Sequence, residues 1–145
     1  EYLDAAASVD QAVATASAAL SDEVSIRRVR HVLTELARTR EAFAAMRAAD
    51  WTTFGVLMDA SHVSLRDDYE VTVPELDVAV EAARAAGAIG ARMTGGGFGG
   101  SAIALVPAGT TAEVADAVAQ AFAAQGFAAP AFLVSRAAAP AGVLA

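Results

Sequence analysis

Five of the eleven glycines in this 145-residue sequence stand together in one short run, interrupted by a single phenylalanine. The run is Gly95-Gly96-Gly97-Phe98-Gly99-Gly100. Glycine adopts positive φ at little steric cost, and without side chains the backbone amides are open to an anion such as phosphate. Ordering so many glycines costs chain entropy. We therefore expect the run to serve a ligand rather than a tight turn alone.

Two common phosphate-binding motifs do not fit this run. Gly95, Gly97 and Gly100 satisfy the letters G-x-G-x-x-G, but the dinucleotide-binding motif needs a helix directly after its glycines. The residues that follow, Ser101–Val106, have the character of a strand. A Walker A loop needs a lysine, and all ten basic residues of this chain are arginines. The run is therefore expected to be the loop of a β-hairpin.

The remaining chemically capable residues do not form a complete catalytic or metal-binding set. His31 and His62 are the only histidines, and we expect packing or surface roles for both because neither has a second ligand cluster nearby. Ser61 precedes His62, but the nucleophile motif G-x-S-x-G is absent. Adjacent acids such as Asp67 and Asp68 are usually solvated. The sequence thus predicts no catalytic residue and no metal ligand.

Composition limits the class of protein. A hydrophobic fraction of 56% with 19% charged residues predicts a folded domain, and 145 residues can bury one core. The net charge of −7 argues against nucleic acid as a partner. No apolar run reaches the roughly 20 residues that span a bilayer, and the acidic start at Glu1 lacks the basic region of a signal peptide. A start at Glu1 without an initiator methionine also suggests a cut inside a longer chain.

Apolar spacing and capping residues predict helices first and a small sheet later. We expect a helix up to about Leu20, a second over Ile26–Ala49, and a third that begins after the N-cap Asp50 and ends before a polar connection at Ser61–Glu70. Capping boxes at Thr72/Glu75 and Thr110/Glu113 predict two further helices, which end at Ala86 and before Gly126. The expected strands are Ile89–Thr94, Ser101–Val106 and Ala131–Ser135.

The second predicted helix carries a stripe of large apolar side chains at helical spacing, which we expect to be core. The stripe consists of Val29, Val32, Leu33, Leu36, Phe43 and Met46. Together the elements predict an α+β fold with helices on one face of a small antiparallel sheet. We expect one domain over residues 1–145, with residues 1–25 as its helical entry and a low-complexity tail at Arg136–Ala145.

Several segments resemble one known family. Arg92–Gly100 is similar to the third conserved motif of galactokinases, which belong to the GHMP superfamily of small-molecule kinases. The residues Ser61-His62, Ser64–Val71 and Pro74–Asp77 resemble the galactokinase segment that precedes this motif. Arg28–Val32, Phe54-Gly55 and Leu57-Met58 also fit. The resemblance covers roughly residues 26–135.

Galactokinases transfer the γ-phosphoryl group of MgATP to the C1 hydroxyl of galactose in a cleft between two domains. The resemblance implies that this chain is the C-terminal, ferredoxin-like domain of such a cytoplasmic enzyme, inactive alone, with its own N-terminal domain as a partner. That N-terminal domain would hold most of the galactose, ATP and Mg²⁺. This chain would add residues that shape the phosphate and sugar pocket. These residues are Thr94, Gly95, Gly96, Gly97, Phe98, Gly99 and Gly100.

Three other functions stay open from the sequence. The parent protein could phosphorylate N-acetylgalactosamine or another sugar, because the residues that contact the sugar lie outside this chain. It could be a galactokinase-like sensor without catalysis. The chain could also be a free-standing binding module, although an incomplete site and a missing initiator methionine argue against this reading.

Overall fold

The computed structural model describes residues 8–136, in which five helices accompany a two-stranded antiparallel sheet. The helices are α2 (Val9–Ser17), α3 (Glu23–Arg47), α4 (Trp51–Asp67), α5 (Pro74–Ala85) and α6 (Thr111–Gln125). The strands are β1 (Gly90–Thr94) and β2 (Ser101–Leu105). The α+β class predicted from the sequence is therefore confirmed. None of the helices in the described residues combines the length and apolar character needed to cross a bilayer.

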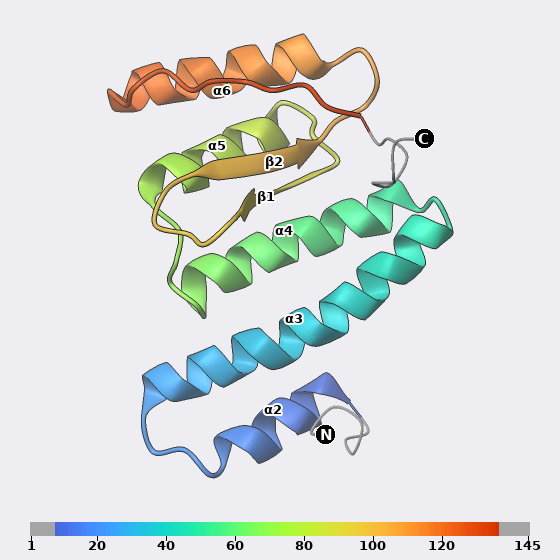
Figure 1. The fold of residues 1–145 in the computed structure, drawn as a ribbon, viewed down its shortest axis with the longest axis vertical. Coiled ribbons are helices and arrows are strands. Elements are labelled where there is room, and N and C mark those ends of the chain that lie inside the picture. Colours follow the sequence, from blue (N-terminus) through green and yellow to red (C-terminus); the bar gives the residue numbers. More distant parts are fainter. Residues whose placement is uncertain (1–7, 137–145) are drawn as a thin grey trace, which may run out of the picture.

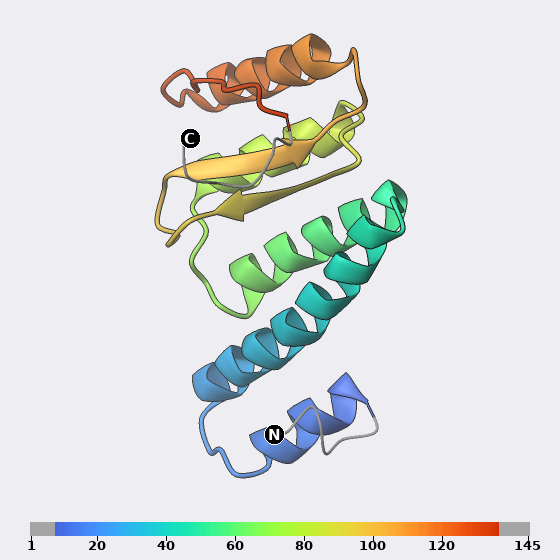
Figure 2. The same ribbon diagram turned by 45° about the vertical axis from the view of Figure 1, so that its right-hand side comes forward.

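The elements form a stack that Figure 1 shows from α2 at the bottom, through α3, α4 and the β1–β2 hairpin, to α6 at the top. Helix α5 lies behind the hairpin, and the turned view of Figure 2 confirms this arrangement. One cluster of buried residues joins α5, α6 and β1, and includes Val80, Val118 and Phe122. A second, around Met93, joins β1 to α4 and α5. The hairpin thus has α5 against one face.

Helix ends follow the capping signals in part. The Asp50 side chain accepts a hydrogen bond from the Thr53 amide, as predicted for an N-cap. Gly126 ends α6 in the left-handed conformation, also as predicted. The two capping boxes are wrong, because no side chain caps α5 or α6: Val73 stands at the N-cap of α5, and the Thr110 hydroxyl donates to the Pro107 carbonyl.

The predicted polar connection at Ser61–Glu70 is largely wrong. Helix α4 continues through it to Asp67, and three of its polar side chains are buried. Each has a polar partner from another element: Ser61 donates to Glu35, His62 accepts from the Met93 amide, and Ser64 bonds to His31. Buried polar groups with such partners are compatible with a helix, so polarity alone did not mark a loop.

Two further predictions fail in the structure. The expected strand Ala131–Ser135 has no regular secondary structure. Its apolar side chains Phe132, Leu133 and Val134 are exposed rather than packed in a sheet. The apolar stripe on α3 is core only in part: Leu33 is buried and Val29 packs with it against α2, while Val32, Leu36, Phe43 and Met46 are about half exposed. Helical spacing identified α3 as a helix but could not show which side other elements cover. The predicted tail Arg136–Ala145 and entry segment lie partly outside the described residues.

The two edges of the sheet differ. On the β1 edge, the Ala91 amide donates to Asp59 and the Met93 amide donates to His62, so side chains of α4 replace a neighbouring strand. These two amides point away from β2. In an antiparallel pair, the backbone amides and carbonyls of the residues opposite them, Ala104 and Ala102, therefore point away from β1, toward the outer side of β2. Within residues 8–136 no third strand pairs with β2. Among the described residues, the outer edge of β2 therefore has no strand paired with it.

Candidate functional site

The glycine run forms the loop between β1 and β2, as predicted. Positive φ angles occur at Gly95 (91°), Gly97 (85°), Gly99 (121°) and Gly100 (98°), and also at Phe98 (59°). Gly96 is the one glycine of the run that does not have a positive φ. A backbone with several residues in this region accommodates few side chains, which explains the choice of glycine here.

The loop is anchored at one point and is open elsewhere. The Phe98 amide donates a hydrogen bond of 2.7 Å to the Val71 carbonyl, which lies in the segment between α4 and α5. A Cβ atom added at Gly97 would lie 2.5 Å from this same oxygen. At Gly95, Gly96, Gly99 and Gly100 an added Cβ would meet no atom within 4 Å. The structure therefore leaves free space along most of the loop.

A groove of about 300 Å³ lies next to the start of this loop, between α3, α4 and the hairpin. Thr94, the last residue of β1, lines it and so connects the groove to the glycine run. The other polar residues that line it are Glu35, Arg38, Thr39, Ser61 and Arg92. Its apolar residues are Ala42, Phe54, Leu57, Met58 and Ile103.

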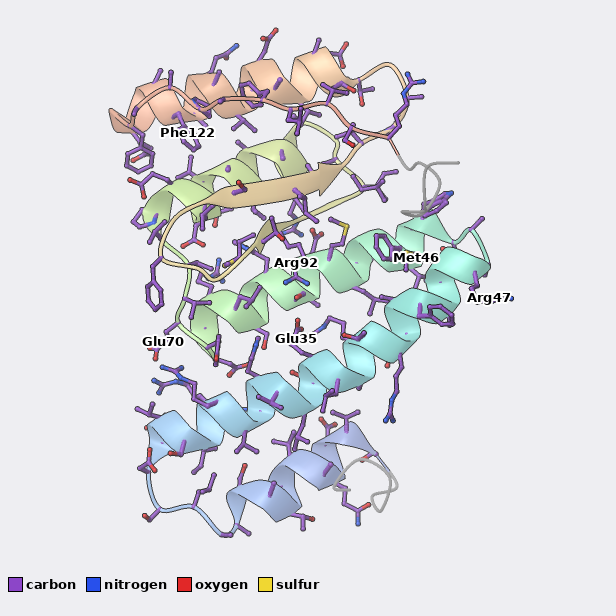
Figure 3. All side chains as sticks on the ribbon, in the orientation of Figure 1. Glu35, Met46, Arg47, Glu70, Arg92 and Phe122 are labelled. Carbon is purple, nitrogen blue, oxygen red and sulfur yellow. The ribbon has the colours of Figure 1, made fainter. Side chains whose placement is uncertain are left out.

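The polar centre of the groove holds two guanidinium groups and one carboxylate. Arg38 forms an ion pair with Glu35, and Nη1 of Arg92 lies 4.0 Å from Oε2 of the same carboxylate. The Ser61 hydroxyl donates a 2.6 Å hydrogen bond to that oxygen. Figure 3 shows the Glu35 and Arg92 side chains next to each other in front of α4. The centre carries an excess of one positive charge, although the whole chain is acidic.

Burial affects both arginines of the groove. It lowers the pKa of Arg92 and of Arg38 below the usual value of an arginine, because desolvation disfavours a charged group. The Arg92 guanidinium lowers the pKa of Arg38 further, while acids such as Glu41 act against this. Two partly buried cations that share one carboxylate can interact favourably with an added anion.

Sequence reasoning selected Thr94, which lines the groove, but it did not select Glu35 or Arg38 as site residues. Two signals were available. Glu35 and Arg38 stand three residues apart on one helix and so share a face. Arg92 alternates with the buried residues Ala91 and Met93, which places it on the opposite face of the hairpin. Neither signal tells that these faces meet.

The histidines have structural contacts, as the sequence suggested. Nδ1 of His62 accepts from the Met93 amide at 3.2 Å, and Nε2 lies 3.2 Å from Asp77 Oδ1. His31 stacks on Tyr69 with ring centroids 4.5 Å apart. Burial lowers the pKa of both imidazoles, while Asp77 acts against this for His62.

Asp67 and Asp68 are ion-paired with Arg66 and Arg30. The described part of the chain has no group of three residues that could hold a metal ion.

Comparison with known proteins shows the family to which this fold belongs. The family model described as GHMP kinases C terminal matches residues 42–125, more than half of the chain and including the glycine loop. The chain belongs to the GHMP kinase family. In this GHMP kinase domain, the matched region begins in the last part of α3 and ends with α6.

Individual relatives of the GHMP kinase domain are galactokinases. It is 49% identical over 113 residues to the galactokinase of Mycobacterium tuberculosis and 51% identical over 112 residues to that of Streptomyces coelicolor. The matches cover 78% and 77% of this chain but only 31% and 29% of the relatives. The chain therefore spans about a third of the length of the curated relatives that it matches.

A solved structure gives the same result. The crystal structure of Lactococcus lactis galactokinase complexed with galactose matches with a TM-score of 0.79 and 44% sequence identity. The match covers 85% of this chain and 32% of that chain. The GHMP kinase domain described here is thus similar in sequence and in fold to one part of a galactokinase.

Proposed function

We propose that this chain is the C-terminal domain of a galactokinase, which transfers the γ-phosphoryl group of ATP to the C1 hydroxyl of galactose in the cytoplasm. The observation that carries the proposal is the agreement between sequence and structure: identities near 50% to galactokinases, and a TM-score of 0.79 to one of them. The glycine loop lies inside the matched family region.

The proposed role of residues Thr94 to Gly100 is to form one wall of the cleft in which the phosphoryl group moves. Phosphoryl transfer depends mainly on positioning and on stabilisation of negative charge, and backbone amides without side chains can approach the phosphate closely. The open space around Gly95, Gly96, Gly99 and Gly100 fits a bound anion. The positive centre at Arg38 and Arg92 lies beside the same loop and favours negative charge there.

ATP and Mg²⁺ fit this chain only in part. When bound, MgATP supplies the phosphoryl group, and the loop offers space for its phosphates. The residues described here include no lysine and no cluster suited to a divalent cation. We therefore assign Mg²⁺ and most of the nucleotide contacts to another domain of the same enzyme.

The proposed partner is the remaining part of the galactokinase chain. The relatives are about three times as long as their matched regions. Half-exposed apolar side chains follow one helix, and the groove also has apolar walls. Exposed apolar side chains gathered in this way are typical of an interface between domains. The side chains on the helix are Val32, Leu36, Phe43 and Met46.

A coupled assay of ADP release tests the proposal. The longer protein that contains this domain should release ADP with Mg²⁺ and galactose, at roughly 1 s⁻¹ or faster as is usual for enzymes. The 145-residue chain alone should show no galactose-dependent turnover. Turnover by the isolated chain would show that the catalytic residues lie within it.

Substrate specificity is tested in the same assay with N-acetylgalactosamine and glucose in place of galactose. Faster turnover with either sugar than with galactose would show that this sugar is the substrate of the enzyme. Binding of galactose and ATP to the longer protein without turnover would instead identify a non-catalytic sensor. Neither outcome would change the assignment of the chain to the GHMP kinase family.

A further inference from the structure

The segment between α4 and α5 is held to α3 by a group of arginines. Arg27 and Arg28 approach the same carboxylate oxygen of Glu70, with Nη2 atoms at 3.0 Å and 2.7 Å. Arg28 also donates to the backbone carbonyl of Asp68, and Arg30 pairs with the Asp68 carboxylate at 3.0 Å. We call the contact of Arg27 and Arg28 with Glu70 the arginine clamp. Figure 3 shows Glu70 near the start of α3. Arg27 and Arg28 are 43 and 42 residues away from Glu70 in the sequence.

The clamp holds a backbone conformation that a glutamate rarely adopts. Glu70 has a φ of 58°, in the left-handed region that favours glycine. Its neighbour Tyr69 stacks on His31, and the Arg28 guanidinium lies 5.7 Å from the Tyr69 ring. A residue persists in this region only where its surroundings fix it. The two ion pairs and the ring contacts supply this constraint.

The residue directly after Glu70 is the anchor of the glycine loop. Val71 is buried, and its amide donates to the Leu65 carbonyl at 3.1 Å. Its carbonyl accepts the 2.7 Å hydrogen bond from Phe98, itself a residue with positive φ, and its atoms fill the space next to Gly97. Within residues 8–136 this is the one backbone hydrogen bond between the loop and a segment outside the hairpin.

A direct path of contacts therefore runs from α3 to the loop: from the clamp to Glu70, from Glu70 through one peptide unit to Val71, and from Val71 to Phe98. We propose that Glu70 is a positioning residue, and that the arginine clamp sets the place of the glycine loop in the cleft. This inference rests on the proposed function, because it assigns to the clamp an effect on phosphoryl transfer.

A stability role alone would give a different pattern. The Glu70 side chain is 48% exposed, and exposed ion pairs contribute little to the free energy of unfolding. Removal of the carboxylate should therefore leave folding almost unchanged. A misplaced catalytic group, in contrast, can lower a rate strongly because transfer depends on alignment.

The test uses Glu70→Gln in the full-length kinase that contains this domain. We expect kcat for galactose phosphorylation to fall on the order of tenfold, while KM for galactose stays within about twofold, because the loop acts on the transition state rather than on sugar binding. Hydrogen exchange at the Phe98 amide, measured by mass spectrometry on peptides covering the loop, should become faster in the same variant.

The matched control is Glu81→Gln. Glu81 is also exposed and pairs with an arginine, Arg66, at 3.6 Å, but this pair lies on α4 and α5 and does not touch the loop anchor. It should leave both kcat and the exchange of Phe98 unchanged. A second variant, Glu70→Gly, removes the carboxylate and the cost of positive φ together. It should show the same loss of kcat with no loss of thermal stability.

The results separate the two proposals. If the wild-type kinase phosphorylates galactose but Glu70→Gln matches it in kcat and in Phe98 exchange, the positioning role is refuted and the galactokinase assignment stands. If the wild-type protein does not phosphorylate a sugar, the proposed function fails. Faster exchange at Phe98 in Glu70→Gln would still support the mechanical link, and unchanged exchange would refute it.

Discussion

Gly97 has a positive φ and a close contact with Val71, and a side chain would disturb both. Alanine at this position should therefore break the contact between the loop and Val71. Its φ is 85°, and an added Cβ would lie 2.5 Å from the Val71 carbonyl oxygen and 2.7 Å from the Val71 Cβ. Neither atom can withdraw easily, since Val71 is buried and its amide and carbonyl are both hydrogen-bonded. Gly97→Ala must therefore move the loop away from its anchor.

The magnitude follows from two terms. Left-handed φ at a residue with a Cβ costs about 1–2 kcal/mol, and crowding in a packed site costs about 1–3 kcal/mol. The free energy of unfolding should thus fall by roughly 2–5 kcal/mol, a large share of the ~5–15 kcal/mol of a typical domain. For a chain of this size the melting temperature should fall by about 2–4 °C for each kcal/mol.

Two other glycines of the loop separate these terms. Gly96 has neither a positive φ nor an atom within 4 Å of an added Cβ, so Gly96→Ala should stay within about 0.5 kcal/mol of the wild type. Gly99 has a φ of 121° but open space, so Gly99→Ala should cost only the conformational term, about 1–2 kcal/mol. Urea denaturation followed by circular dichroism measures all three variants.

The order of the three effects is the decisive result. If Gly97→Ala costs no more than Gly99→Ala, the contact between the loop and Val71 is not as described. If Gly96→Ala is the most damaging, Gly96 rather than Gly97 occupies the crowded position of the loop. In the full-length kinase, Gly97→Val should lower kcat/KM by more than about tenfold, and equal kinetics would contradict the proposed role of the loop.

Three further predictions concern packing and charge. Phe43→Ala in the isolated chain should change the free energy of unfolding by less than about 0.5 kcal/mol, because Phe43 is 58% exposed; Met93→Ala, at a residue 1% exposed, should cost about 2–5 kcal/mol in the same urea titration. Gly55→Ala should cost at least about 3 kcal/mol, since its Cβ would overlap the Ile89 backbone, with C at 2.6 Å, and a melting temperature equal to that of the wild type would contradict this close approach of α4 and β1. Burial lowers the pKa of His62 below its usual 6.5, so the unfolded chain binds a proton there before the folded chain does, and stability should fall as the pH drops below about 6.5; His62→Gln should flatten this part of the curve of melting temperature against pH, and an unchanged slope would exclude the effect.

Local signals in the sequence predicted the elements well where one residue decides the backbone. Asp50 caps α4 with its own side chain, and Gly126 ends α6 because its left-handed φ suits glycine. The glycine run predicted its loop for the same reason. These features need no information from distant parts of the chain.

Burial was harder to predict because it depends on what packs against an element. Leu36 is 51% exposed although its spacing on α3 matches a core position. Ser61 and Ser64 are buried in α4 although their polarity suggested a loop, because Glu35 and His31 on α3 provide their hydrogen-bond partners. Spacing along one helix contains no information about such partners.

In the candidate site, too, local features were predictable from the sequence and contacts between distant segments were not. Thr94 and the glycine loop were predicted from adjacent residues. The groove beside them requires Glu35, Arg38 and Arg92 to meet from α3 and β1, and this depends on the tertiary arrangement. The anchor of Phe98 on Val71 is likewise a contact between distant segments, so only the structure could reveal it.

The open outer edge of β2 has a consequence for how this domain behaves when it is handled alone. The outward amides and carbonyls at Ala102 and Ala104 can pair with any extended peptide that approaches, and Ile103 adds an exposed apolar side chain on the same strand. Two isolated copies can therefore join edge to edge at high concentration. Dilution would reverse such pairing, whereas a strand that belongs to the same protein would close the edge at every concentration.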